Sequence, residues 1–183
     1  MLYSFEERRP YLGEGTYVSE TAAVIGNVRT GKGCYIGHGA IIRADYGAIE
    51  IGDGTAIEEG VIIHAPPGGF CRIGAHVIVG HGAIIHAANI GESCAIGMGA
   101  VISLEAEVGA GTIVAEGAVV VQGRKIPPSV VVAGSPARRL RDVRQEEKDF
   151  WADAAKLYMD LAATYLKGAM QCIDALHCRE SKG

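Results

Sequence analysis

Three histidines in the middle of the sequence have a spacing that could serve metal chemistry. His64 is followed 17 residues later by His81, and His86 comes five residues after that. Neutral imidazole nitrogens are common ligands of Zn²⁺ at ~2.0–2.1 Å, and three of them leave a coordination position open for water or substrate. Whether these three side chains can share an ion depends on the elements that position them.

Those elements are units of six residues, each opened by an aliphatic residue. Twenty opening positions run from Leu12 to Val132, and only Thr30 among them is not Leu, Ile or Val. A period of six matches neither an amphipathic helix nor a single alternating strand. It indicates short strands joined by tight corners and stacked into a solenoid. The 26 glycines among the 183 residues, about twice the usual ~7%, suit such corners.

This repeat resembles that of the hexapeptide-repeat proteins, in which three units form one triangular coil of a left-handed parallel β-helix. The resemblance implies an all-β solenoid of six to seven coils, although its hand opposes the usual right-handed crossover. We expect the β-helix domain to occupy residues 1–136. Residues 137–183 are expected to form a C-terminal α-helix and a loosely ordered tail that pack back on the solenoid.

The helix is expected between Gln145 and Leu166, after a boundary marked by prolines. Its apolar residues recur at intervals of three and four, which is typical of one helical stripe. The predicted stripe consists of Phe150, Ala154, Leu157, Tyr158, Leu161, Tyr165 and Leu166.

If three units make a coil, residues three units apart at the same place in their units stack one strand spacing, ~4.8 Å, apart. His64 and His86 follow opening residues that are three units apart, so they should stack on adjacent coils. Arg43 belongs one coil below His64, provided that the extra residues in 44–50 form a bulge. His81 falls on the preceding face and cannot easily reach an ion bound by His64 and His86 around the corner of its own prism, but a second chain could supply it. Three-fold assembly would then create three equivalent sites.

The segment Gly80–His86, together with Ile62-Ile63-His64 and Arg43-Ala44-Asp45, resembles the γ-class carbonic anhydrases. In that family, three histidines bind a divalent metal across a homotrimer interface, two from one chain and one from the next. The resemblance implies that His64 and His86 bind with the neighbour's His81, to Zn²⁺ with Fe²⁺ or Co²⁺ as alternatives. It also implies hydration of carbon dioxide to bicarbonate by metal-bound hydroxide.

Four further residues are candidate catalytic residues. Arg43 and Asp45 are expected to form an ion pair that either aligns the subunits or acts directly. Glu58 belongs to the face that carries His81, where it could accept a proton from water or simply be solvated. Tyr158 of the expected helix either lines the pocket or packs against the solenoid.

The sequence departs from the best-known family members near the site. Ala56 and Glu58 stand where those members have Asn and Gln, and Tyr46 follows Asp45 where Glu is common. The loop 66–72 is short and has no acidic residue, whereas the archetypal enzymes carry a proton shuttle there. The predicted ligands are therefore kept while the proton-transfer groups differ.

These departures leave two other functions open. Hexapeptide acyltransferases share the fold, and the Asp45-Tyr46-Gly47 stretch resembles carbonic-anhydrase-like relatives that work as thioesterases or accessory proteins in CoA pathways. The alternatives are therefore an acyl-CoA-linked transferase or thioesterase and a non-catalytic metal-binding accessory protein. Acyltransferases generally lack the three-histidine set, which favours the lyase.

Composition excludes several other classes. A net charge of −4 gives no electrostatic footprint for nucleic acid or an anionic membrane. The short basic cluster 138–144 is expected on a solvated helix start. The five cysteines are odd in number and scattered, which argues against disulfides or a zinc ribbon and favours the cytoplasm. The N-terminus shows no secretory signal, and no apolar run approaches the ~18 residues of a membrane span.

Overall fold

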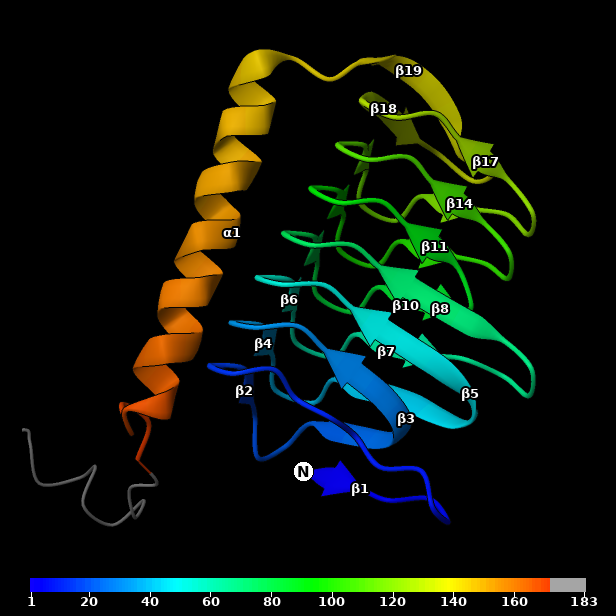
Figure 1. Cartoon of the computed structure of the whole chain (residues 1–183). Coiled ribbons are helices and arrows are strands. Elements are labelled where there is room, and N and C mark those ends of the chain that lie inside the picture. Colours follow the sequence, from blue (N-terminus) through cyan, green and yellow to red (C-terminus); the bar gives the residue numbers. More distant parts are fainter. Residues whose placement is uncertain (172–183) are drawn as a thin grey trace, which may run out of the picture.

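A computed structural model, which describes residues 1–171, folds as a left-handed triangular β-solenoid with one long helix along its side (Figure 1). The expected tail 172–183 lies outside the described residues. Each coil contributes strands to three walls. The first, here called the helix wall, contains β2 (Tyr17–Val18), β4 (Tyr35–Ile36), β6 (Ala56–Ile57), β9 (Ile78–Val79), β12 (Ala95–Ile96), β15 (Ile113–Val114) and β18 (Val130–Ala133).

The other two walls share two long strands that bend from one to the other, β3 (Ala23–Thr30) and β5 (Ile41–Ile51). The histidine wall continues with β7 (Ile62–His64), β10 (Ile84–His86), β13 (Val101–Ile102) and β16 (Val119–Val120). The third wall continues with β8 (Phe70–Ile73), β11 (Asn89–Ile90), β14 (Glu107–Val108) and β17 (Lys125–Ile126).

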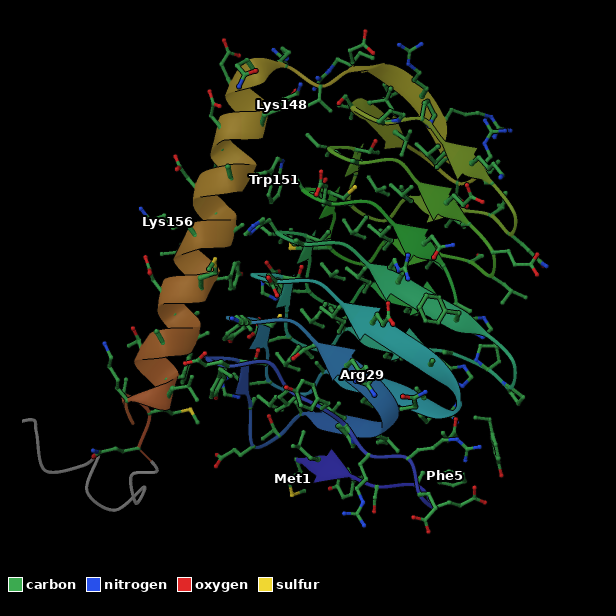
Figure 2. All side chains as sticks on the ribbon, viewed as in Figure 1. Met1, Phe5, Arg29, Lys148, Trp151 and Lys156 are labelled. Atoms are coloured by element: carbon green, nitrogen blue, oxygen red, sulfur yellow. The ribbon has the colours of Figure 1, made fainter. Side chains whose placement is uncertain are left out.

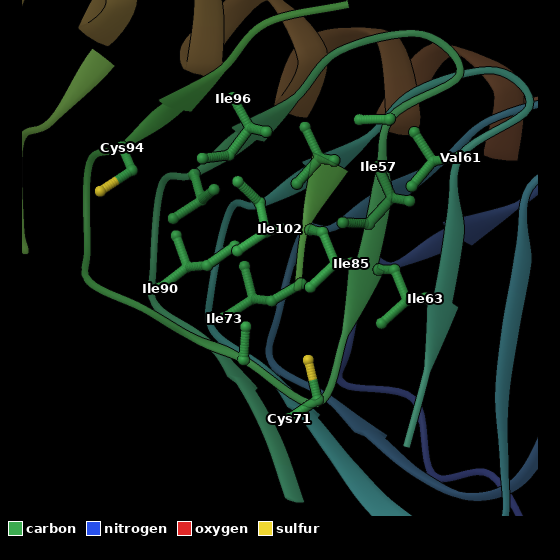
Figure 3. Packing of buried hydrophobic residues seen from close by; sticks show 14 of the residues in the cluster. Ile57, Val61, Ile63, Cys71, Ile73, Ile85, Ile90, Cys94, Ile96 and Ile102 are labelled. Atoms are coloured by element: carbon green, nitrogen blue, oxygen red, sulfur yellow. The ribbon is translucent and has the colours of Figure 1, made fainter. Parts of the chain in front are cut away.

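Aliphatic ladders fill the interior of the prism (Figure 3). Because side chains alternate across a strand, the opening residue of each unit points inward and its neighbours point outward. Ile42, Ile63 and Ile85 of the histidine wall are each fully buried, one above the other. The parallel pairings between successive coils confirm the predicted solenoid and its register.

The bulge expected within residues 44–50 is present. Gly26 pairs with Ala44 but Val28 pairs with Ile49, so β5 carries extra residues at the corner between the histidine wall and the third wall. Arg43 nevertheless pairs with His64, because the extra residues come after it. The register of the histidine wall is therefore undisturbed.

Glycine is required at corners where one coil rests closely on the next. A Cβ built at Gly74 would lie 2.5 Å from the backbone nitrogen of Glu92 on the following coil, closer than atoms can approach. At the corner that leads into the helix wall, a second position adopts left-handed backbone angles. Gly54 occupies it in one coil with φ 61°, whereas His76 occupies it in the next with φ 55°. Both residues therefore stand in a conformation that glycine adopts without strain.

Helix α1 (Gln145–Leu166) has the predicted bounds and packs on β2, β4, β6 and β9 of the helix wall. The Glu147 side chain accepts a hydrogen bond from the Arg144 backbone N–H at 2.9 Å and caps the first turn. The buried residues of α1 are Ala155 and Ala162, flanked by partly buried Trp151, Ala154, Tyr158, Leu161 and Tyr165.

The predicted stripe is wrong at three positions, since Phe150 (63% exposed), Leu157 (66%) and Leu166 (54%) point away from the solenoid. The reason lies in the surface that α1 covers. The outward side chains of the helix wall include Tyr17 and Tyr35. Tyr165 and Tyr158 of α1 pack on them, with ring centroids 4.6 and 5.3 Å apart. The helix is therefore rotated so that these two tyrosines and the buried Ala155 and Ala162 face the wall.

Short strands cover both ends of the solenoid. At the N-terminal end, β1 (Leu2–Tyr3) pairs with β3. At the other end, β19 (Arg138–Asp142) pairs antiparallel with β18. The expectation that the basic cluster 138–144 begins a helix is therefore wrong for its first part, because residues 138–142 form a strand. The β-structure extends to Asp142, beyond the expected domain boundary at 136, because β18 needs a partner on its open edge.

Candidate metal centre

His64 and His86 lie side by side on the outer surface of the histidine wall. They end β7 and β10, where they pair directly in the parallel register. Their rings stack with centroids 5.2 Å apart and planes 9° from parallel. Partial burial, the Arg43 charge and His86 lower the pKa of His64, which favours the neutral imidazole that binds metals. The predicted column of Arg43, His64 and His86 is thus present.

Arg43 and Asp45 form the expected ion pair. The Arg43 Nη1 donates to Asp45 Oδ2 at 2.6 Å, and Asp45 Oδ1 lies 4.0 Å from His64 Nε2. Desolvation would raise the pKa of Asp45, but the Arg43 guanidinium outweighs it and holds this pKa below its usual value. The bulge after Ala44 places this carboxylate beside the histidine pair. The carboxylate lies near the His64 imidazole but forms no hydrogen bond with it at this distance.

His81 lies at the corner that follows β9, apart from the stacked pair, as its register predicts. Its Nε2 is 3.1 Å from Glu58 Oε2, and its Nδ1 is 2.8 Å from Glu59 Oε2. Its backbone N–H also donates to Glu58 Oε2 at 3.0 Å. Glu58 therefore stands on the predicted side with His81, where it is buried to 6% exposure. The His81 side chain is 49% exposed and open to a neighbouring molecule.

Glu59 and Tyr35 were not among the predicted site residues. The Tyr35 hydroxyl donates to Glu59 Oε1 at 2.7 Å, while Glu59 Oε2 faces His81. The repeat count could have found Glu59, because it follows Ile57 by two residues just as His81 follows Val79 three units later. No such count reveals Tyr35, whose role depends on the direction of its side chain.

Tyr158 projects from α1 into the aromatic cluster on the helix wall, with its ring 5.3 Å from that of Tyr35. Burial and the nearby carboxylate of Glu58 raise its pKa, so the hydroxyl stays protonated at neutral pH. Tyr158 therefore packs against the solenoid and borders Glu58, and its role in lining a pocket stays a prediction. Ala56, buried beneath the helix, offers no polar group at this edge.

Imidazole nitrogens suit a divalent metal, and the described chain carries them at two separate places. Within residues 1–171 of one chain, no group of three or more His, Cys, Asp or Glu side chains is placed to hold an ion. The chain instead presents two imidazoles at one place and a third at another. Glu59 on Nδ1 of His81 matches the carboxylate that commonly orients a metal-binding histidine. The donor types therefore fit a divalent metal, with the third imidazole apart from the other two.

The fold and the histidine register define a hexapeptide-repeat β-helix protein of the carbonic-anhydrase-like type. Escherichia coli carnitine operon protein CaiE is 35% identical over 163 residues, which cover 87% of this chain and 81% of CaiE. The chain belongs to the γ-carbonic anhydrase-like family that includes CaiE. No protein-family model matches the sequence.

Plant and bacterial relatives agree with this assignment. Mitochondrial γ-carbonic anhydrase 2 of Arabidopsis thaliana is 33% identical over 162 residues, covering 85% of this chain but only 58% of the plant protein. The chain thus spans less than two thirds of that relative. An acetyltransferase-like structure from Bacillus cereus superposes with a TM-score of 0.88 at 29% identity, covering 93% of this chain and 98% of that one. A hexapeptide transferase family protein from Anaplasma phagocytophilum superposes with a TM-score of 0.84 at 29% identity, covering 90% and 98%.

In the described part of the chain, no helix has the length and apolar character needed to cross a membrane.

Proposed function

We propose that the protein is a homotrimeric, metal-dependent lyase that hydrates carbon dioxide to bicarbonate at sites shared between subunits. The observation that carries this proposal is the division of the histidines, with His64 and His86 stacked on one wall and His81 at another corner. Zn²⁺ is the proposed ion, with Fe²⁺ or Co²⁺ as alternatives. Such an ion, when bound, lowers the pKa of water and supplies hydroxide near neutral pH.

An exposed apolar ladder supports the association of copies. Ile41, Ile62 and Ile84 point outward from the histidine wall, and each is 41% exposed. They lie in register on adjacent coils. Each comes one residue before the inward-pointing isoleucine of its strand and two residues before Arg43, His64 or His86. A continuous apolar strip of this kind favours burial against another protein surface. A second copy seated there could bring its own His81 to the histidine pair.

The side chains of this chain have distinct roles in the proposed site. His64 and His86 provide two nitrogen ligands, and Asp45, held by Arg43, places a negative charge beside the first of them. Glu59 fixes the tautomer of His81 by accepting from Nδ1, which leaves Nε2 for the metal. Glu58 lies beside His81 on the same chain. Once His81 Nε2 binds the metal and no longer faces Glu58, this carboxylate can accept a proton from a nearby water.

Subunit complementation tests the shared site directly. His81→Ala chains lack one half of every site, and His86→Ala chains lack the other half. In mixed trimers, an interface between an intact histidine pair and an intact His81 is complete. Random mixing in equal amounts makes about one quarter of the interfaces complete, because each half is intact with a chance of one half. We expect metal content and carbon dioxide hydration, measured by stopped flow, to recover to that level.

Either of two results would contradict the proposal. If one chain supplied all the ligands, mixing the two inactive variants could not restore activity. Variants that stay inactive after mixing therefore refute a shared site. A monomeric mass in light scattering at micromolar concentration does the same. The control is His76→Ala, which removes a histidine from a different corner and should leave metal content unchanged.

A second candidate function is an acyl-CoA-linked reaction. It is favoured by the two transferase-like structures at 29% identity and by the absence of acidic residues in the loop 66–72. Hydrolysis of acetyl-CoA by metal-loaded protein, followed in parallel, distinguishes the two. Thioester hydrolysis with no carbon dioxide hydration would replace the lyase proposal. Metal binding with neither activity would favour an accessory protein.

A further inference from the structure

A groove separates the N-terminal half of α1 from the part of the helix wall that contains β9 and β15. It has a volume of about 650 Å³, within the range of small-molecule sites. Its lining residues come from α1, from the helix wall and from the corner that carries His76. Tyr158 and Glu58 are not among them. None of the proposed metal ligands borders it. The groove is therefore separate from the candidate metal centre, and an inference about it does not rest on the proposed function.

The floor of the groove is apolar. Ile78 and Ile113 project from the helix wall, and Ala155 faces them from α1. Trp151, one turn earlier in the helix, adds a half-buried indole (Figure 2). At the same outward position, the wall carries tyrosine in β2 and β4 but isoleucine in β9 and β15. An apolar body of alkyl or aromatic character would bury this surface from water.

The rim on the solenoid side carries polar side chains in a strained conformation. His76, Ser93 and Ser129 line the groove, and their φ angles are 55°, 54° and 56°. In other coils of the same corner this position is glycine, as at Gly54 and Gly111 with φ 61° and 64°. A residue with a Cβ costs roughly 1–2 kcal/mol in this region relative to right-handed angles. The three strained residues thus place hydrogen-bonding groups along one edge of the groove.

The rim on the helix side carries two lysines, Lys148 and Lys156, both exposed (Figure 2). Neither forms an ion pair with any residue of the described chain. Two acids also border the groove. Asp149 already accepts a hydrogen bond from Gln145 Nε2 at 2.8 Å, and Glu92 lies on the solenoid side. The helix side of the groove is therefore the side that can receive a negative charge.

We propose that this groove binds an organic anion with an apolar body, of the alkyl or aromatic carboxylate class. The body would lie on Ile78, Ile113 and Trp151. The carboxylate would face Lys148 and Lys156, while hydroxyls of the opposite rim donate to its second oxygen. This arrangement combines the apolar floor and few polar groups that are typical of small-molecule sites.

Trp151 is the single tryptophan of the chain, so its fluorescence reports directly on the groove. Decanoate is the probe, titrated into the full-length protein below its micelle concentration. We expect a saturable change in Trp151 emission. Decyltrimethylammonium has the same alkyl length with the opposite charge, and it should bind at least tenfold more weakly. Calorimetry on the same samples checks that the optical change reports binding.

Paired charge variants complete the test. Lys148→Gln with Lys156→Gln removes two charges at the groove, and decanoate should bind about tenfold more weakly, a change equivalent to 1.4 kcal/mol. Lys125→Gln with Lys167→Gln removes two charges elsewhere and should change affinity less than twofold. Circular dichroism confirms that each variant is folded. The proposal fails if decanoate gives no saturable signal, if the cationic probe binds equally well, or if both double variants weaken binding alike.

Discussion

Replacing Tyr35 by phenylalanine tests whether the buried tyrosine holds the carboxylate that faces His81. Tyr35 is 2% exposed, and its hydroxyl donates to Glu59 at 2.7 Å. A hydrogen bond to a charged group contributes about 1.5–3 kcal/mol to stability. The Glu59 side chain is 37% exposed, so water can partly replace the lost donor. We therefore expect Tyr35→Phe to lower the free energy of unfolding by about 1.5 kcal/mol, at the lower end of that range.

The effect should extend to the metal. Residues that orient a ligand histidine typically change metal affinity by about 10–100-fold when removed. Because Tyr35 acts through Glu59, we expect Tyr35→Phe to weaken Zn²⁺ binding by about tenfold. Competition with a chromophoric chelator measures that affinity, and urea denaturation of the metal-free protein at fixed concentration measures stability.

Tyr17→Phe is the matched control. Tyr17 lies in the same aromatic cluster, with its ring 5.7 Å from that of Tyr35, and it is 8% exposed. The same substitution there should cost less than about 1 kcal/mol, because no carboxylate bond is lost. A double-mutant cycle between Tyr35→Phe and Glu59→Gln should give a coupling of about 1 kcal/mol. Equal effects of the two tyrosine substitutions, or no coupling, would refute this account of His81 positioning.

Three further predictions concern the fold and its pH dependence. Ile85→Ala, in the fully buried ladder, should lower the free energy of unfolding by about 2–5 kcal/mol in urea, and a loss under 1 kcal/mol would contradict the packing described. Gly74→Ala should lower the free energy of unfolding by about 1–3 kcal/mol, because its Cβ would lie 2.5 Å from a backbone nitrogen. Unchanged stability would show that the coils can separate there. Glu147→Gln tests the helix cap. The bidentate bond from Arg141 lowers the pKa of Glu147 from 4.5 to about 2, so its contribution is complete above pH 4.5 and is lost as pH falls through 2. The stability difference between wild type and Glu147→Gln should shrink over that interval, and a difference that stays constant would contradict this account of the cap.

The solenoid could be predicted almost completely from the sequence because its register is a matter of counting. The stack of Arg43, His64 and His86 follows from the number of units between them, and so does the separation of His81. The unit count stays correct despite the bulge after Ala44, because the extra residues follow the part of β5 that pairs with β7. One-dimensional architectures allow this, because each coil contacts only its neighbours.

Features that depend on packing outside the repeat could not be predicted in the same way. The exposure of Phe150 and Leu157 follows from the packing of Tyr158 and Tyr165 on Tyr35 and Tyr17, a contact that helical periodicity alone does not predict. The strand at 138–142 forms because β18 has an unpaired edge, although its sequence is rich in arginine. Tyr35 became part of the candidate site through the direction of a single side chain.

The three-walled coil makes the length of the chain between two residues as important as their identity. Deleting one six-residue unit between His64 and His81 would leave every local motif intact. It would nevertheless move both His81 and His86 away from the walls that they occupy now. Inserting a full coil of three units there would instead leave them on their original walls, with the ladder lengthened by one rung. We therefore expect the prism to accept insertions and losses of whole coils far from the histidines. Frame changes of six or twelve residues within the segment 64–86 should abolish metal binding without unfolding the prism.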